Sequence, residues 1–397
     1  MSILGKLAVW LVQLEGRKFT SLQRCANPSF LVGSKRGLAL YIHIPFCQQP
    51  CLYCSFLSHQ FDTQLARRYF QNLKTEIELY LTKGFHFSCL YVGGGTPTIM
   101  MDELGHLLSY LKGHCGELSI SLETVPIDIT PKNILLLKEL NVRRLSVGVQ
   151  SFNDEFLARI GRNSHSGKVA KEKIQLAKGA FDTLNIDILY DIPEQPLEVL
   201  LSDIEIVKEL KVDQVTFYPF MPSPSAPSQS NEEHFYRTIL TKMQDNGWKA
   251  KTAWCFCQGD KMIDEYILDY NDYIGVGCSA IGLLDGNLYV NTFSLERYDQ
   301  ILKLGKFPTV LSKRLTAWEI FCYRLLTRLF KMHIKQERLG LPSNLILKLL
   351  QFLAVIEDNK GELMVTEKGM VIVSSMMKEF FSSLNRLRSY CIQSPIC

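Results

Sequence analysis

Strand-like and helix-like segments alternate along residues 38–218, and this alternation limits the possible folds more than any other feature of the chain. Short apolar runs are separated by stretches whose apolar residues recur three or four positions apart, and each strand–helix unit takes about 30 residues. Such repetition predicts a parallel sheet with right-handed helical crossovers. The expected strands are 38–45, 89–92, 118–122, 144–149, 186–190 and 214–218, and the expected helices include 63–81, 102–111, 133–140 and 197–210.

Six strand–helix units are too few for the eight-unit closed barrel, so we predict an α/β fold of the open, partial (β/α)6 kind. The pattern changes after residue 311, where a short strand-like turn at 360–365 lies among three helix-like segments, 315–330, 344–356 and 370–384. This part predicts a mostly helical, winged-helix-like domain. The expected divisions are an N-terminal extension (1–37), a partial barrel (38–310) and a C-terminal domain (311–397).

Composition limits the class of protein and its expected location in the cell. The chain has 397 residues, a net charge of +4 and 47% hydrophobic residues, which is ordinary for a globular protein. No window reaches the ~18 consecutive apolar residues of a membrane span, and the mild charge gives no reason to expect nucleic acid as a partner. Residues 7–14 resemble the core of a secretion signal, but no small-residue cleavage site follows them, so we expect a cytoplasmic protein.

Three of the twelve cysteines, Cys47, Cys51 and Cys54, form the pattern C-x3-C-x2-C at the end of the first expected strand. Three thiolates in one loop suit three irons of a [4Fe–4S] cluster, and the fourth iron would then be open to a cofactor or substrate. A structural zinc ion is an alternative, because His43 or His59 could supply its fourth ligand. Chance clustering of inert thiols is another, and spacing alone does not decide among the three.

Residues with ligand-binding chemistry also follow other expected strands. Gly93, Gly94 and Gly95 come after the second strand, where they would form a tight turn or let the backbone approach a ligand closely. Glu123 ends the third strand, where it could accept hydrogen bonds from an ammonium group, and Asp187 is a carboxylate within the fifth strand. Because barrel proteins assemble their sites at the carboxyl ends of strands, we expect these residues to face one site.

Residues 41–56, YIHIPFCQQPCLYCSF, resemble the signature of the coproporphyrinogen III dehydrogenase and heme chaperone group of radical S-adenosylmethionine (SAM) proteins, which comprises HemN and HemW types. The resemblance implies that SAM chelates the open iron, and that the reduced cluster can cleave SAM to a 5′-deoxyadenosyl radical. It also implies a methionine-binding loop at 93–97, an arginine for the SAM carboxylate and an aspartate for the ribose. The expected SAM contacts are Tyr41, Gly94, Gly95, Thr96, Glu123, Gln150, Arg162 and Asp187.

Two features favour the HemW type, a heme chaperone that binds heme and delivers it to an acceptor protein. Phe56 stands where the HemN type carries a fourth cysteine, and the N-terminal segment is shorter than that of the oxidase. Two departures weaken the match to the family. The asparagine of its E-x-N-P motif is missing after Glu123, and residues 263–268 lack the histidine and tryptophan expected there.

Other interpretations stay open. If the chain is catalytic, the resemblance implies an oxygen-independent coproporphyrinogen III oxidase, which decarboxylates porphyrinogen propionates. A radical SAM protein with another substrate, such as a tRNA, is a third candidate because residues 313–328 are basic. Cys255 and Cys257 lack partner cysteines for a second cluster and are expected to be ordinary thiols, whereas His43 is equally compatible with a functional and a structural role.

Overall fold

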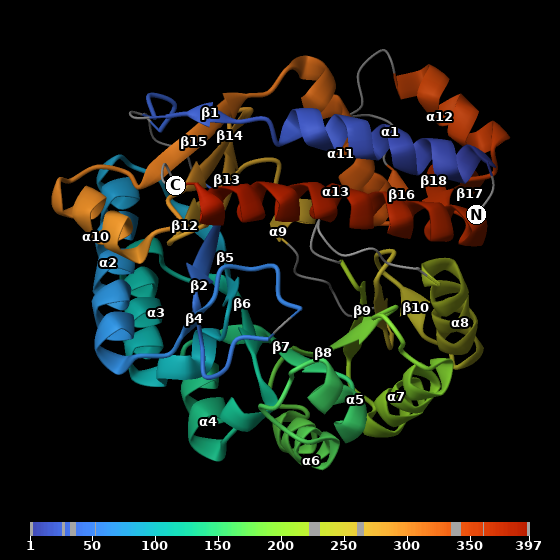
Figure 1. Ribbon diagram of the computed structural model, residues 1–397, viewed down its shortest axis with the longest axis horizontal. Coiled ribbons are helices and arrows are strands. Elements are labelled where there is room, and N and C mark those ends of the chain that lie inside the picture. The colour runs from blue at the N-terminus through green and yellow to red at the C-terminus, as the bar shows by residue number, and fades with distance from the viewer. Residues whose placement is uncertain are drawn as a thin grey trace.

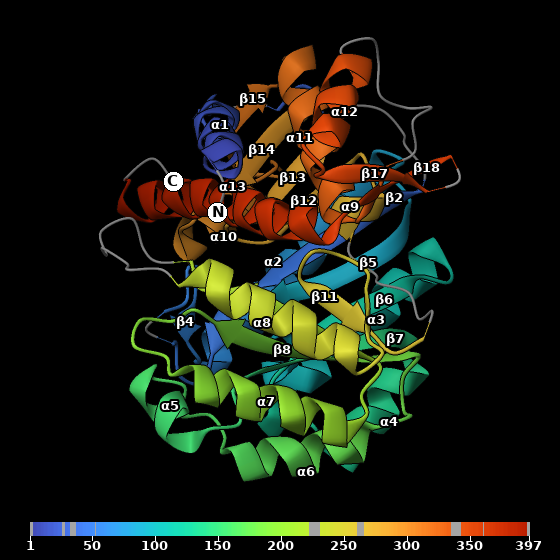
Figure 2. The ribbon, with the colours of Figure 1, turned by 90° about the vertical axis from the view of Figure 1, so that its right-hand side faces the viewer.

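The computed structural model describes residues 3–25, 28–31, 37–51, 53–221, 231–259, 266–334, 343–359 and 361–394. A curved sheet occupies the centre of the molecule, with helices along its outer side (Figure 1, Figure 2). A second group of helices lies across its open side. Part of the stretch 263–268, in which the family motif was sought, falls outside the described residues.

The six predicted strands are present and parallel. They are β2 (Leu38–Ile44), β5 (Phe87–Gly94), β6 (Ser119–Thr124), β7 (Val142–Gln150), β8 (Thr183–Tyr190) and β9 (Gln214–Pro219). Each strand pairs with the next in this order, which confirms the partial (β/α)6 arrangement. Most of their residues are buried, as expected for parallel strands that are covered on both faces.

The crossover helices begin at residues that cap them. Asp62, Thr130 and Ser166 each accept a hydrogen bond from the backbone N–H three residues further on, and Pro131 occupies the first turn of its helix. Buried residues recur at helical spacing on the face toward the sheet. The helices are α2 (Thr63–Thr82), α3 (Met101–Cys115), α4 (Pro131–Glu139), α5 (Asp154–Arg159), α6 (Gly167–Ala177), α7 (Leu197–Leu210) and α8 (Glu232–Asp245).

Further strands extend the sheet at both edges. They are β12 (Tyr273–Val276), β13 (Ile281–Leu284), β14 (Asn287–Asn291), β15 (Thr309–Arg314) and β1 (Gln23–Arg24) beyond β2, and β11 (Cys255–Cys257) and β10 (Lys249–Ala250) beyond β9. β12 is parallel to β2, and the other added pairings are antiparallel. The described sheet has two separate ends, β1 and β10, so it is an open sheet and not a closed barrel. The short helix α9 (Tyr266–Asp269) lies between β11 and β12 in the chain, and α10 (Leu295–Lys303) connects β14 to β15.

The helical group combines the two ends of the chain. It contains α1 (Ile3–Phe19), α11 (Ala317–Phe330), α12 (Ser343–Phe352) and α13 (Glu367–Gln393), with a small antiparallel sheet of β16 (His333–Ile334), β18 (Glu362–Val365) and β17 (Ile356–Asn359). α1 lies beside α13 (Figure 1). A mostly helical C-terminal part is therefore confirmed.

The N-terminal segment contributes to the core of this group. The ring centroid of Phe19 lies 5.4 Å from those of both Tyr323 and Phe380. The expected boundary between residues 310 and 311 falls inside β15, which pairs with β14 in the large sheet. The division into an extension and two domains stays a prediction.

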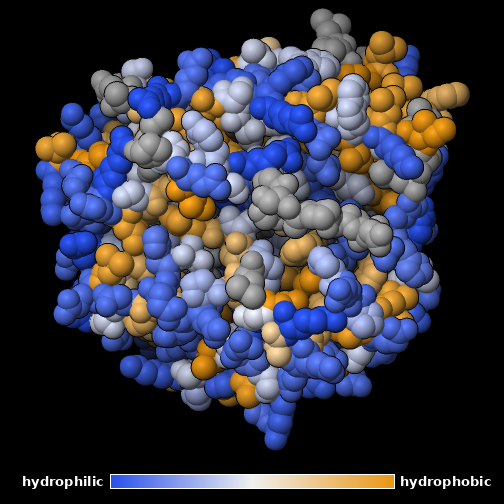
Figure 3. Space-filling model, in the orientation of Figure 1, coloured by the Kyte–Doolittle hydropathy of each residue, from blue (hydrophilic) through white to orange (hydrophobic). Residues whose placement is uncertain are grey.

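None of the described helices is both long enough and apolar enough to span a membrane. On the face in Figure 3, hydrophilic and hydrophobic residues are interspersed.

A buried carboxylate joins α2 to the β12 edge of the sheet. Glu76 accepts hydrogen bonds from the Tyr298 hydroxyl, from Asn291 Nδ2 at 2.8 Å and from the Gly277 backbone N–H at 2.8 Å. Burial raises the pKa of Glu76 to about 7, because the three donors only partly replace the lost hydration of the charged form. The protonated Glu76 thus stabilises the fold fully at pH values below the pKa that this carboxyl has in the unfolded chain. That contribution is lost as the pH rises through the folded-state pKa of about 7.

We predict that Glu76→Gln removes a pH dependence from the free energy of unfolding. Between pH 5 and pH 8 the parent should lose about 2–3 kcal/mol more stability than the variant, because only the parent ionises at this position. Urea unfolding at both pH values measures the difference, and Glu78→Gln on the exposed side of the same helix is the control. Identical pH dependence in Glu76→Gln and the parent would contradict the assignment.

Candidate functional site

The three clustered cysteines lie in a loop that leaves the carboxyl end of β2. Cys47 belongs to β3 (Phe46–Cys47), which pairs in parallel with β4 (His59–Gln60) at the end of the loop. The His59 N–H donates to Pro45 O at 2.7 Å, and the Phe61 N–H donates to Cys47 O at 2.9 Å. The loop is therefore closed at its base by backbone hydrogen bonds, and its thiols all lie at the carboxyl end of the sheet.

The glycine loop after β5 is bonded directly to the cysteine strand. The Gly95 N–H donates to Ile44 O at 2.7 Å, and the Thr96 N–H donates to Phe46 O at 2.8 Å. A Cβ atom on residue 95 would lie 2.6 Å from Phe46 O and 3.0 Å from Cys47 Sγ. Gly94 has φ = 120°, which side-chain-bearing residues rarely adopt. Glycine is thus required at positions 94 and 95, because the backbone of this loop lies close to the backbone of the cysteine strand.

Two predicted SAM contacts touch the thiols themselves. Thr96 Oγ1 lies 3.7 Å from Cys47 Sγ, and Arg162 Nη1 lies 3.4 Å from Cys51 Sγ. Burial raises the pKa of the Cys47 thiol to about 11, and it also raises the pKa of Cys54. Binding of a metal ion would favour the thiolates, because its positive charge offsets the cost of burying their negative charge.

Arg162 is positioned by the turn after α5. Its Nη2 donates to Gly148 O at 2.6 Å, while its Nε is buried without a hydrogen-bond partner. Tyr53 of the cysteine loop packs against the small apolar cluster that α5 forms with the residues after β8. Arg162 and the cysteine loop are therefore held together, and an anionic ligand could occupy the remaining N–H of the guanidinium.

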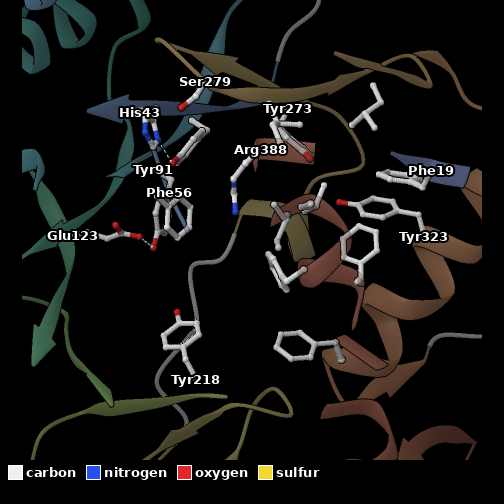
Figure 4. A pocket seen from close by; sticks show the side chains of 18 of the residues that line it. Phe19, His43, Phe56, Tyr91, Glu123, Tyr218, Tyr273, Ser279, Tyr323 and Arg388 are labelled. Carbon is white, nitrogen blue, oxygen red and sulfur yellow. Dashed lines mark hydrogen bonds between the residues drawn. The ribbon is translucent and has the colours of Figure 1, made fainter. Parts of the chain in front are cut away.

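Glu123 lies at the end of β6, beside the glycine loop. It accepts hydrogen bonds from the Tyr91 hydroxyl at 2.7 Å (Figure 4) and from the Gly94 N–H at 3.2 Å. A Cβ atom on Gly93 would lie 2.9 Å from this carboxylate. Burial raises the pKa of Glu123 to about 7, although both hydrogen bonds oppose the shift.

Asp187 is held in the same way on β8. One oxygen accepts from Ser146 Oγ at 2.9 Å and the other from Asn185 Nδ2 at 2.7 Å. Burial raises the pKa of Asp187, while the nearby Arg144 guanidinium lowers it. A cationic or hydroxyl-rich ligand would stabilise both this carboxylate and that of Glu123 in their charged forms.

Gln150 has a left-handed backbone, with φ = 73°, where a bulge interrupts the pairing of β7 with β8. Such strain in a residue other than glycine is concentrated at functional sites.

Tyr41 lies on β2, where its hydroxyl is 2.8 Å from His43 Nδ1. His43 Nε2 lies 3.4 Å from Leu57 O and therefore carries the ring proton, so Nδ1 accepts the Tyr41 hydrogen. Burial lowers the pKa of His43 to about 3, which keeps the ring neutral.

The structure thus brings most of the predicted site residues to the carboxyl ends of the strands and the loops that follow, whereas Tyr41 and Asp187 lie further back on β2 and β8. The supporting roles of Tyr91, Ser146 and Asn185 were not predicted. Strand alternation could have identified Tyr91, because it lies two residues before Gly93 on the same face of β5. Cys255 and Cys257 are fully buried thiols on β11, as expected for ordinary core residues.

Comparison with known proteins shows which families this chain is similar to. The sequence profile of the Radical SAM superfamily matches residues 41–204. Heme chaperone HemW from Buchnera aphidicola subsp. Acyrthosiphon pisum is 27% identical over 384 residues, which cover 86% of this chain and 98% of that protein. Residues 41–204 thus match the Radical SAM superfamily, and the chain as a whole is similar to heme chaperones of the HemW type.

Two further relatives support the match. Heme chaperone HemW from Bacillus subtilis is 27% identical over 291 residues, which cover 68% of this chain and 76% of that protein. Coproporphyrinogen III oxidase (HemN) from Escherichia coli has a similar fold, with a TM-score of 0.74 and 22% identity over 91% of this chain and 94% of that one.

The radical SAM family implies a [4Fe–4S] cluster and SAM, and the residues present fit both. Within the described residues, no three His, Cys, Asp or Glu side chains converge on one point where they could hold a single metal ion. A cubane cluster has a different requirement, since each cysteine ligates a different iron. A ligand can approach the backbone closely at the glycine loop after β5, and the buried Arg162 Nε offers it a charged hydrogen-bond donor. The roles of individual residues stay predictions.

We predict that changing Cys47, Cys51 and Cys54 together to Ala abolishes the cluster. Anaerobic reconstitution of the parent should give about four iron and four sulfide per chain, which iron analysis and visible absorbance measure. Cys322→Ala, on a half-buried cysteine of α11, is the control and should retain the cluster. Cluster absorbance near that of the parent in the triple variant would overturn the assignment.

We also predict that Asp187→Ala weakens SAM binding about 10- to 150-fold, because it removes a charged acceptor. Arg162→Ala should have a similar effect, with cluster content measured separately because Arg162 touches Cys51. Calorimetry of the reconstituted proteins gives the affinities. Asp182→Ala is the control, because Asp182 is exposed and pairs with Arg143. Unchanged affinity in both site variants would remove these residues from the site.

Proposed function

We propose that this chain is a heme chaperone, which binds heme beside a SAM-and-cluster site and transfers it to an acceptor protein. The observation that carries the proposal is a cavity between the carboxyl end of the sheet and the helical group. Tyr91 and Glu123 line it on the sheet side, and Phe19 and Tyr323 line it on the helix side (Figure 4). Tyr41 of β2 also belongs to the lining. Two of the expected SAM contacts, Tyr41 and Glu123, therefore line the cavity.

The lining of this cavity suits a flat, apolar macrocycle. Most of its side chains are aromatic or aliphatic, and they come from strands, from α1, from α11 and from α13. Aromatic rings bury large apolar areas and pack on other π systems at close range. Phe56, in place of the fourth cysteine of the HemN type, also faces the cavity and adds a ring to its wall. The HemW relatives support heme as the ligand.

The chain's own residues have distinct tasks in this proposal. Cys47, Cys51 and Cys54 hold the cluster, and the glycine loop with Arg162 orients SAM on it. Glu123 and Asp187 accept hydrogen bonds from its amino and ribose groups. Cluster and SAM, when bound, supply one-electron reducing chemistry next to the heme cavity. We expect the protein to work in the cytoplasm, where thiols stay reduced.

We predict that the reconstituted protein binds about one heme per chain and does not convert coproporphyrinogen III to protoporphyrinogen IX. An anaerobic heme titration followed by absorbance measures the first, and a turnover assay with SAM and reductant measures the second. The triple cysteine variant is the cluster-free control.

Two results would contradict the chaperone proposal. Decarboxylation clearly above the cluster-free control would favour an oxygen-independent coproporphyrinogen III oxidase. If the protein shows no turnover and binds no heme, a radical SAM protein that acts on another class of substrate, such as a tRNA, would be favoured.

A further inference from the structure

Arg388 projects from α13 into the cavity beside the cysteine loop (Figure 4). Its guanidinium carbon lies 4.2 Å from the ring centroid of Phe56, and its Nη1 donates to Asn385 Oδ1 at 2.7 Å. The stacking and the hydrogen bond fix the side chain at a defined point between the helix and the loop.

We propose that Arg388 binds a carboxylate of the cavity's ligand, so that a tetrapyrrole enters with a propionate edge toward the cysteine loop. The proposal rests on the heme-binding function proposed above and names the group by which the ligand is oriented. The residue is assigned as a binding residue for an acidic side chain of the macrocycle.

Charge supports this assignment. Among the described residues that line the cavity, Arg388 is the one lysine or arginine, and His43 is kept neutral by burial. An arginine stays charged at every physiological pH, and in aromatic surroundings its charge is only weakly screened. Glu123, the one acidic residue among the described lining, offers no positive charge to an incoming carboxylate, so the ligand's acidic group is expected to lie at Arg388.

The geometry of the guanidinium supports it as well. The guanidinium carbon lies over the Phe56 ring, and a planar guanidinium can match the two oxygens of a carboxylate through the N–H groups in its plane. Phe19 and Tyr323 lie on the other side of Arg388 from Phe56 (Figure 4), and Phe19 packs against Tyr323 and Phe380. This part of the cavity suits an apolar edge of the ligand, and Arg388 suits an acidic one.

Heme and heme dimethyl ester, whose propionates are masked, provide the test. The reconstituted parent should bind heme about 10-fold or more tightly than the ester, because the ester lacks the charge that Arg388 recognises. Arg388→Gln should lose this preference by weakening heme binding to the level of the ester, while ester binding stays the same. Arg388→Lys, which keeps the charge but not the planar fork, should show an intermediate preference.

Arg386→Gln is the matched control, since Arg386 lies two residues away on α13 and donates to Ser383 outside this cavity. Equal affinity of the parent for heme and ester would overturn the proposal, and that comparison needs no variant to fold. Unchanged heme binding in Arg388→Gln, or a loss of SAM binding in its place, would also overturn it. A parent that binds neither compound would refute the heme chaperone function itself, and this proposal with it.

Discussion

Two backbone hydrogen bonds hold the site together, from Gly95 to Ile44 and from Thr96 to Phe46. They continue the parallel pairing of β2 with β5 past the ends of both strands, which places the glycine loop against the first cysteine. A side chain at residue 95 would lie 2.6 Å from a carbonyl oxygen and would force the two loops apart. The positions of Cys47, Thr96 and Glu123 all depend on this approach.

From this contact the site spreads around the sheet, one strand at a time. Glu123 and Asp187 share a physical condition, because burial raises the pKa of each and disfavours its charged form. A cationic ligand would relieve that cost, and SAM carries an ammonium and a sulfonium group. In the proposed complex, these anionic groups would lie on one side of SAM, and the Arg162 guanidinium lies near the thiols.

Local sequence patterns predicted the sheet well, because burial on both faces makes each parallel strand a short apolar run. They predicted α7 at Leu197–Leu210 and the strands that carry Glu123 and Asp187. They did not predict the contact between Phe56 and Arg388, which joins the cysteine loop to α13 and has no local signature. The packing of α1 along α13 was missed for the same reason. Tertiary contacts of this kind depend on the folded arrangement and not on periodicity.

The central claim is that SAM binds directly at the cluster held by the three cysteines. Electron paramagnetic resonance of the reconstituted, reduced protein, recorded before and after addition of SAM, tests it most directly. We expect a [4Fe–4S]⁺ signal whose g-values shift when SAM is added, because SAM would become a ligand of the open iron. A cluster signal that saturating SAM leaves unchanged would contradict it.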